Sequence, residues 1–355
     1  MKKIIIRLFV FSTIIGIIGI TYLSVIGIET DRLNKRISKV IKKIDKNLNI
    51  ELNNVKVILN PLTLSLNAKT AGANLTYRGK ILQLEQIKTN ISLLAVIKKE
   101  KFILTGLSAS TKSVNLKNLI SIIRLFKNDP KLFVLEQFTK NGYLVANIEF
   151  KFDGKGKLGN NYKLDGIIKN GTFRVSDKYE LDKIDLKFDI KQNIYQIEDF
   201  NFLFNGKKIN SNKIRIEKKN KKFLVSGKIE NKDTIINKKE INDLIISKNF
   251  DLEINEINFN SQNNFNLQID ENLKINNLNF NSDIVLNNLE IQNSFKIKKF
   301  FPNIKKEFIL QNHKIKLNYN KNDFNISGSG KMMLQDEHDN IEYKFTKKKD
   351  INYYN

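Results

Sequence analysis

Residues 184–190 read Ile-Asp-Leu-Lys-Phe-Asp-Ile, with an apolar side chain at every second position and a charged one at each position between. Side chains leave a β-strand alternately on its two faces, so this pattern predicts a strand with one apolar and one charged face. The same alternation recurs from about Val55 to Ile326. It predicts a mainly β fold, a long and curled antiparallel sheet with a few short helices, whose apolar face has to lie against something.

The apolar positions of the clearest strands are the candidate contact residues of that face. They are Val55, Val57, Leu59, Leu64, Leu66, Ile148, Phe150, Phe152, Ile184, Leu186, Phe188, Ile190, Phe200, Phe202, Phe204, Phe265, Leu267 and Ile269. Three partners could cover such a face: a second sheet, the bilayer around a membrane barrel, or lipid chains in an open groove. The sandwich and the groove share the same alternation, so the pattern leaves both open.

Composition limits the classes of function. The formal net charge of +24 suggests nucleic acid as a partner, but the lysines are spread one or two to a strand rather than clustered, so we expect no nucleic acid. The absence of cysteine excludes disulfides and thiolate chemistry. Only three prolines and no Pro/Gly/Ser-rich linker interrupt the strand pattern, which predicts one elongated domain over residues 50–355.

The N-terminus predicts a membrane anchor. Residues 1–7 form a short basic segment, and residues 8–28 are uncharged and rich in Ile, Leu, Val and Phe, long enough to span a bilayer. A cleaved signal peptide would end in small residues, yet no alanine precedes Ala68, so we expect an uncleaved transmembrane signal anchor. The basic residues that follow would place the body in the cytoplasm by the positive-inside rule, but long domains translocate largely regardless of charge. Charge counting therefore leaves the side open.

Residues 29–48 place apolar side chains at helical spacing and predict an amphipathic juxtamembrane helix. That helix could lie on the lipid surface or shield the edge of the first strand. Two further helices are predicted inside the sheet domain, near residues 117–127 and 234–247. Asn-Gly pairs such as 141–142, 170–171 and 205–206 mark tight turns, which favours an antiparallel meander.

No residue pattern assembles a catalytic, cofactor or metal site. The two histidines, His313 and His338, are too far apart in sequence for a zinc motif. The acidic run at residues 336–339 is more typical of a solvated turn than of a metal site, and residues 154–159 lack the ending of a phosphate loop. We therefore expect a protein that is not an enzyme and needs no cofactor.

Residues 50–61 read Ile-Glu-Leu-Asn-Asn-Val-Lys-Val-Ile-Leu-Asn-Pro, and Leu-Thr-Leu-Ser-Leu follows at 62–66. Residues 81–94 then read Ile-Leu-Gln-Leu-Glu-Gln-Ile-Lys-Thr-Asn-Ile-Ser-Leu-Leu. Behind an N-terminal span, this order resembles the AsmA-like superfamily, which includes TamB and YhdP relatives. The resemblance implies a repeating β-groove anchored in the inner membrane, with its C-terminal body in the periplasm, that moves phospholipid for envelope lipid transport or outer-membrane biogenesis. Full bridges of this family are longer, so we expect a short member or an N-terminal fragment.

The leading hypothesis is an inner-membrane-anchored, non-enzymatic protein that shields phospholipid acyl chains on the apolar face and lets them slide passively along it. Its partners would be membrane lipids, with envelope proteins meeting its C-terminal end. The alternative is a non-enzymatic assembly or structural factor whose closed β core binds other envelope proteins.

Overall fold

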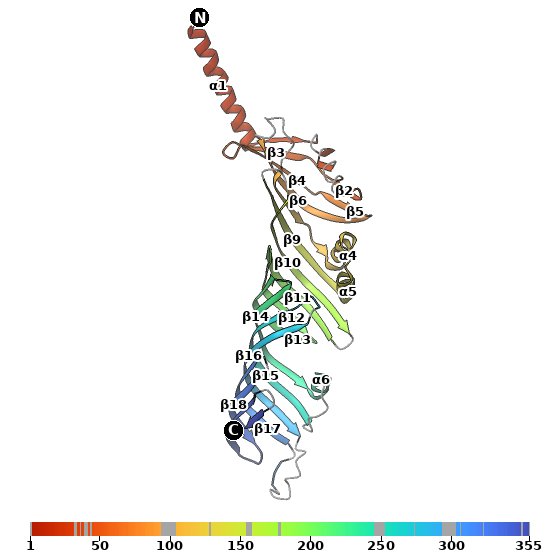
Figure 1. Cartoon of the computed structure of the whole chain (residues 1–355), viewed down its shortest axis with the longest axis vertical. Coiled ribbons are helices and arrows are strands. Elements are labelled where there is room, and N and C mark those ends of the chain that lie inside the picture. Colours follow the sequence, from red (N-terminus) through yellow and green to blue (C-terminus); the bar gives the residue numbers. More distant parts are fainter. Residues whose placement is uncertain are drawn as a thin grey trace. The chain divides into compact units, whose positions relative to one another are not determined.

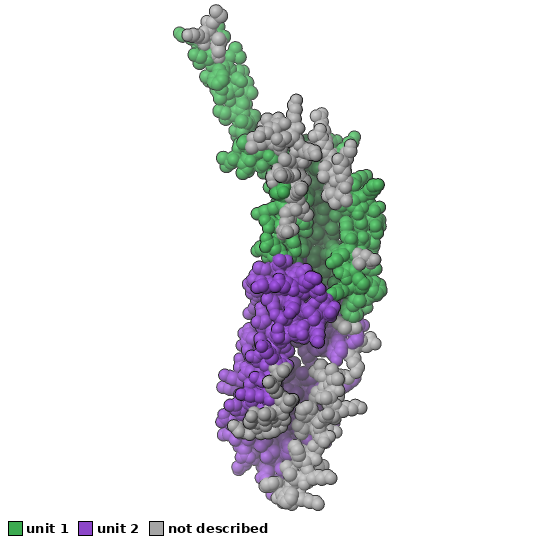
Figure 2. All heavy atoms as spheres, in the orientation of Figure 1, with its two compact units in different colours: residues 1–168, 189–192 green, residues 169–188, 193–355 purple. Residues whose placement is uncertain are grey.

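The computed structural model describes residues 2–31, 34–35, 37–38, 42, 45–93, 104–127, 129–153, 158–176, 179–244, 253–272, 274–292, 303–305, 307–321, 323–348 and 351–354. Its strands form one large antiparallel sheet that is not closed, with short helices and one long N-terminal helix (Figure 1). The predicted mainly β fold is therefore confirmed. The chain divides into two compact units, residues 1–168 with 189–192, and residues 169–188 with 193–355 (Figure 2).

Unit 1 carries the N-terminal helix and the first strands of the sheet. Its elements are α1 (Lys2–Val25), β1 (Ile28–Thr30), β2 (Leu48–Glu51), β3 (Val55–Asn60), β4 (Ser65–Ala71), β5 (Asn74–Tyr77), β6 (Lys80–Ser92), β7 (Leu104–Thr111), β8 (Val114–Asn115), α4 (Leu116–Phe126), α5 (Pro130–Phe138), β9 (Thr139–Phe152) and the first part of β10 (Leu158–Ser176). Neighbouring strands pair in the order β1, β3, β4, β6, β7 and β9. The short strands β2 and β5 extend the first part of β6, and β8 pairs with β9.

Helix α1 contains a segment, Ile6–Val25, that is long and apolar enough to cross a membrane, and none of it is buried by the rest of the chain. The predicted span of residues 8–28 reaches into β1, because the helix ends at Val25 and Ile28 already pairs with Val57. Of the predicted juxtamembrane helix, most residues lie outside the described part of the chain. The described residues 34–35, 37–38 and 42 are helical, whereas residues 29–30 belong to β1.

Helix α4 lies where the periodicity predicts a helix at residues 117–127. Asn115 caps it by accepting a hydrogen bond from the Asn118 amide at 3.2 Å, and Leu116, Ile120 and Ile122 are buried. Helix α5 follows at Pro130, a residue whose fixed φ suits a first helical turn, so the proline starts a second helix there. Both helices lie beside β9 (Figure 1).

Unit 2 is built from consecutive hairpins. Its elements are the rest of β10, most of β11 (Tyr179–Lys191), β12 (Ile194–Phe204), β13 (Lys207–Lys219), β14 (Lys222–Asn237), α6 (Lys238–Leu244), β15 (Glu253–Ile269), β16 (Ile275–Gln292), β17 (Glu307–Asn320), β18 (Asp323–Met333), β19 (His338–Lys348) and β20 (Ile351–Tyr354). From β12 to β20 each described strand pairs antiparallel with the next, as the predicted meander requires.

Helix α6 is shorter than the predicted 234–247. Residues 234–237 continue β14 and pair with residues 256–259 of β15, because Thr234, Ile235 and Ile236 are β-branched and favour the strand. The helix begins only where Asn237 and Glu240 exchange hydrogen bonds at 3.0 Å, each side chain accepting from the other's amide. Residues 245–247 lie outside the described residues.

Several strands of unit 2 contain a bulge, a residue that falls out of register. Lys183, Asp199, Asp233 and Asn312 have positive φ between 47° and 56°, and register shifts flank the last two. A one-residue insertion reverses which face the following side chains occupy and bends the strand. Because of these bulges, the apolar side chains of a strand stay on one face even where their positions change from odd to even numbers.

Candidate functional site: the apolar face

In unit 1 the register brings the predicted residues of β3, β4 and β9 to one face. Val57 pairs with Ala68, Ala68 with Thr89, Thr89 with Leu107, and Leu107 with Phe150. Residues opposite each other on antiparallel strands project to the same side, so this row crosses five strands on one face. The row confirms that residues far apart in sequence share a surface.

A second row, Leu59, Leu66 and Ile91, lies next to the first on β3, β4 and β6. A small core forms around these rows, in which Val55, Ala68 and Ile91 are buried and Ile37, Val57 and Leu66 pack against them. The part of the apolar face nearest β1 is thus closed by side chains of its own strands and by Ile37 of the helical residues that follow β1.

On β9 the face is buried at Leu144 and Ala146 and becomes more open toward the end of the strand. Ile148, Phe150 and Phe152 are half-buried, whereas their neighbours Glu149 and Lys151 are exposed. Among the described residues no second sheet lies over this face. The apolar side is sheltered more than the polar side, as on the inner side of a curved sheet, but it is not sealed.

Leu64 is the one predicted residue that lies outside a strand. Residues 61–64 form a turn, Leu64 has a φ of +46°, and its side chain is 44% exposed. The prediction that Leu64 alternates with Leu66 on one strand is wrong, because Pro61 has no amide hydrogen for a sheet ladder and the chain reverses direction after it.

In unit 2, the strand that reads Ile-Asp-Leu-Lys-Phe-Asp-Ile is β11. Ile184 is buried and packs against Gly171 of β10, while Leu186, Phe188 and Ile190 are half-buried. On the other face, Asp185 accepts hydrogen bonds from the Lys169 side chain at 2.7 Å and the Asn170 amide at 2.9 Å. Burial alone would raise the pKa of Asp185, but these bonds and the Lys169 charge lower it.

The next strand carries the aromatic candidates. Phe200, Phe202 and Phe204 are half-buried and pair with residues 211, 209 and 207 of β13. The rings of Phe200 and Phe202 lie 4.6 Å apart, and the ring of Phe204 stacks on Tyr179 at 6.2 Å. The bulge at Asp199 places these residues on the face that Tyr195 and Ile197 occupy earlier in the strand.

Phe265, Leu267 and Ile269 continue the face on β15. They pair with residues 227, 225 and 223 of β14, which are Gly, Val and Phe, and on the far side Phe265 pairs with Phe280. A side chain on Gly227 would come within 2.9 Å of the Phe265 ring, so the glycine makes room for it. The rows then continue through β17 and β18 as Tyr319 and Phe324.

A polar row crosses this apolar face, and the alternation did not single it out. Asn231, Ser261, Asn263 and Ser282 lie on β14, β15 and β16 and bond to one another. The Ser282 hydroxyl donates to the Asn263 side-chain oxygen at 2.6 Å, the Asn263 side-chain amide donates to the Ser261 hydroxyl at 2.7 Å, and that hydroxyl donates to the Asn231 side-chain oxygen. Ser261 and Ser282 are buried. The signal was present in the sequence, since 261 and 263 share the odd-numbered phase of Phe265, Leu267 and Ile269.

His313 of β17 belongs to the same face and is fully buried. Its Nε2 donates to the Lys331 carbonyl oxygen at 2.9 Å, and the Tyr343 hydroxyl lies 3.4 Å from Nδ1. Burial raises the pKa of Tyr343. The histidine fits because Gly330 opposite it has no side chain.

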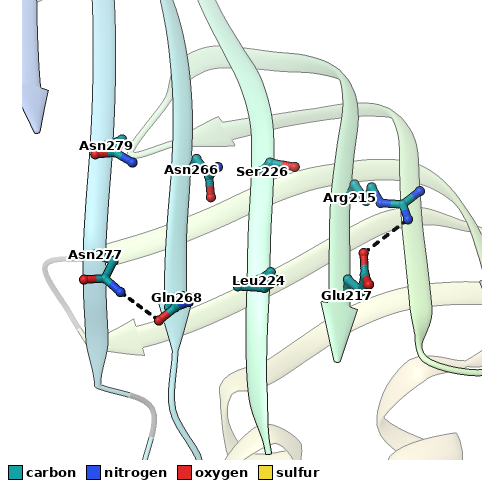
Figure 3. Close-up of a pocket in the computed structure, with 8 residues that line it drawn as sticks. All are labelled: Arg215, Glu217, Leu224, Ser226, Asn266, Gln268, Asn277 and Asn279. Carbon is teal, nitrogen blue, oxygen red and sulfur yellow. Dashed lines mark hydrogen bonds and ion pairs between the residues drawn. The ribbon is translucent and has the colours of Figure 1, made fainter. Parts of the chain in front are cut away.

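A hollow of about 400 Å³ lies on the other face of β13–β16 (Figure 3). Its lining is mainly polar, with Arg215 and Glu217 paired at 3.3 Å and Asn277 donating to Gln268 at 2.9 Å. The register shows why this lining differs from the apolar face. Arg215 pairs with Ser226 and Ser226 pairs with Asn266, and Asn266 is next to Phe265 in sequence, so its side chain lies on the opposite face. This hollow is open and polar, and none of the predicted contact residues lines it.

The described residues hold no cluster of three or more His, Asp or Glu side chains placed to bind a metal ion. The acidic run at 336–339 spans the turn before β19 and its first residues, and His338 there bonds to Gln311 at 3.0 Å. What the described strands share is an extended apolar face. No family model, curated protein or solved structure matches the chain.

Proposed function

We propose that this protein is a membrane-anchored, non-enzymatic carrier that holds phospholipid acyl chains on the apolar face of its open sheet and lets them slide along it. The observation that carries the proposal is the half-buried apolar face itself. It runs through the strands of each unit, and no second sheet of described residues covers it, although Ile37 packs on it near β3 and helices α4 and α5 contact β9. A large uncovered apolar surface is typical of a binding surface rather than of an ordinary monomer exterior.

Acyl chains fit this surface by their chemistry. Each methylene group removed from water contributes about 0.8 kcal/mol, without any directional requirement. Successive rows of Ile, Leu, Val and Phe offer similar contacts to each segment of a chain, so a bound lipid can move without a large barrier. The polar row of β14–β16 satisfies its own hydrogen bonds, so a passing chain does not have to supply any.

The anchor is α1, whose length and apolar character suit a membrane span. We propose that the sheet lies on the periplasmic side of an inner membrane, as the resemblance to the AsmA-like superfamily implies, and that the lipid moves toward the outer envelope. A reporter fused after Asn355 tests this side directly: activity of a periplasmic reporter supports the proposal, and activity of a cytoplasmic one refutes it.

Native mass spectrometry of the detergent-solubilised protein tests the lipid. We expect copurified phospholipid with the natural sequence and its loss in Phe202→Asp, because a carboxylate on the apolar face repels the chain. The matched control is Asn201→Asp, which adds the same group one residue away on the exposed face. Phe188→Asp repeats the test on β11.

A folded, lipid-free natural protein would contradict the proposal, as would equal lipid in both variants. Copurified envelope proteins in place of lipid would instead support the protein-binding assembly factor. The closed β core on which that alternative depends is not what the described strands form.

A further inference from the structure

The turn between β3 and β4 exposes two leucines. Leu62 is 95% exposed and Leu64 is 44% exposed, although hairpin turns ordinarily use Gly, Asn or Asp. Leu64 also has a φ of +46°, a conformation that a leucine adopts only at a cost. Exposure opposes leucine at both positions unless a partner covers the turn, and at Leu64 the positive φ adds a backbone cost.

The turn is held in one shape. The Asn60 side-chain oxygen accepts from the amides of Leu62 at 3.1 Å and Thr63 at 3.2 Å. The amide of Leu93, just after β6, donates to the Leu64 carbonyl oxygen at 2.9 Å. These bonds fix the backbone, so the leucine side chains are presented outward by a rigid turn.

The register places this turn on the side of the sheet where α1 enters. Ile28 pairs with Val57 and Thr30 pairs with Val55, so β3 runs antiparallel to β1, back toward α1. Asn60 lies three residues beyond Val57, which at about 3.3 Å per residue is about 10 Å past the start of β1. The end of β3 therefore passes beside the helix, and α1 contacts β3.

The junction between α1 and β3 is tight. The amides of Ile26 and Gly27 both donate to the Tyr22 carbonyl oxygen, at 2.9 and 3.1 Å, and close the helix. Gly27 has a φ of +74°, and a Cβ there would lie 2.5 Å from the Val57 carbonyl oxygen. Such close packing fixes the end of the helix against the strand that leads to the turn.

We infer that the β3–β4 turn is a second membrane contact, in which Leu62 and Leu64 insert into the interface of the same bilayer that α1 spans. The inference rests on the proposed anchoring by α1, and it adds an entry point to the proposed lipid path. Leu59, Leu66 and Ile91 form the first apolar row behind the turn. Ile91 is buried in the closed core, so the half-buried Leu59 and Leu66 are the residues of this row that an acyl chain leaving the bilayer beside Leu62 meets.

Single labels test the contact, because the chain contains no cysteine. Leu62→Cys carries an environment-sensitive fluorophore in the full-length protein, reconstituted into phosphatidylethanolamine/phosphatidylglycerol vesicles with or without doxyl-labelled lipid. The matched control is Ile81→Cys, also highly exposed but at the other end of β6, and Ile18→Cys in the middle of α1 reports the span. We expect blue-shifted emission for Leu62→Cys and lipid quenching about twofold or more above that of Ile81→Cys, as for a residue at the membrane interface.

The outcomes separate the two proposals. If the Ile18→Cys label is not quenched by lipid, the anchoring by α1 fails and the inference fails with it. If that label is quenched while the Leu62→Cys label is as open to aqueous iodide as Ile81→Cys, only the inference is overturned. A blue shift without lipid quenching means that protein covers the turn, which also overturns it. Leu64→Cys repeats the measurement, with circular dichroism confirming that each variant is folded.

Discussion

The strands next to α1 and the long strands β14–β17 of unit 2 share the same alternation of apolar and polar residues. They differ in how far their apolar side chains are buried. In β3, β4 and β6 the apolar side chains meet and bury one another, with Val55 and Ile91 at 1% and 2% exposure. In β15 the equivalent residues Phe265 and Leu267 stay half-buried, and buried hydroxyl and amide groups replace apolar ones in the polar row.

The difference shows that alternation determines which side chains share a face but not how completely that face is covered. The short strands β3 and β4 and the end of β6 cover their apolar side chains because these side chains pack on one another and on Ile37. Long strands with bulges present a wider surface than their own side chains can fill. The first region packs tightly next to α1, whereas in the second the apolar residues stay half-buried.

Truncating one side chain in each region to alanine gives the largest expected difference in stability between the two regions. Ile91→Ala removes a side chain from the closed core and is expected to destabilise unit 1 by about 2–5 kcal/mol. Leu267→Ala removes a half-buried side chain and is expected to cost about 1 kcal/mol. Hydrogen exchange followed by mass spectrometry on peptides from β4 and β15 measures each unit separately. Equal losses of protection would show that the two faces are equally closed.

A smaller but more specific effect is expected at His313. Gly330→Ala would place a Cβ 2.4 Å from the His313 ring and 2.7 Å from its Cα, so the pair cannot keep its present geometry. Overpacking of this kind costs about 1–3 kcal/mol. The double variant Gly330→Ala/His313→Ala should regain part of the lost stability, because it lacks the clashing ring. Urea unfolding of the two single variants and the double variant measures the coupling, and strictly additive effects would contradict the predicted contact.

Much of this fold was predictable because the period of two survives in nearly every strand. The spacing predicts that the apolar residues within 184–190, within 200–204 and within 265–269 share one face of their own strand, and the structure agrees. The phase changes were not predictable in the same way. A bulge such as Asp199 depends on the register of the neighbouring strand, which no local pattern contains.

The candidate site was predicted less completely than the fold. Leu64 looked like part of an alternating strand because Leu62 and Leu66 flank it, and only Pro61 signalled the turn. Ser261 and Asn263 share the phase of Phe265 in β15, but their polar side chains give no sign that they lie on the apolar face. Register, not composition, assigns a side chain to a face.

A third test of the difference between the two regions concerns the polar row of β14–β16. Ser282→Ala leaves the Asn263 oxygen without its hydrogen bond in a buried setting, which is expected to cost about 1 kcal/mol or more. The control is Asn281→Ala, an adjacent exposed residue on the opposite face. Chemical denaturation of both variants measures the difference. If Ser282→Ala costs no more than Asn281→Ala, the row contributes nothing to the stability of unit 2.

As the pH falls, β10 and β11 should lose stability before strands β3 and β4 do. A hydrogen bond from Thr172 is the main cause that lowers the pKa of Asp182, and bonds from Lys169 and Asn170 lower that of Asp185 against the effect of burial. A lowered folded pKa means that the stabilisation is present above the unfolded value, about 3.9, and is lost as the pH falls through the folded value. Strands β3 and β4 contain no carboxylate.

Hydrogen exchange in β11 should therefore be constant from pH 8 to about 5, after correction for the intrinsic rate, and should rise below about pH 4. Exchange in β3 and β4 should change less over the same range. Asp182→Asn is the control, because it removes one titrating group and should flatten part of the rise. An acid response that begins near neutral pH would contradict the assignment to these carboxylates.

The smallest expected effect concerns the polar faces. Near the anchor, Lys56, Lys69 and Lys88 lie opposite one another on β3, β4 and β6, whereas in unit 2 Asp283 pairs with Lys316. Like charges in cross-strand positions destabilise a sheet, so Lys69→Glu should stabilise unit 1 by about 0.5 kcal/mol at low salt. Lys69→Gln removes the repulsion without adding attraction and should give a smaller gain. Both gains should fade in about 1 M salt, where the screening length drops to about 3 Å. A gain that persists there would have to come from the strand preference of the new side chain rather than from its charge.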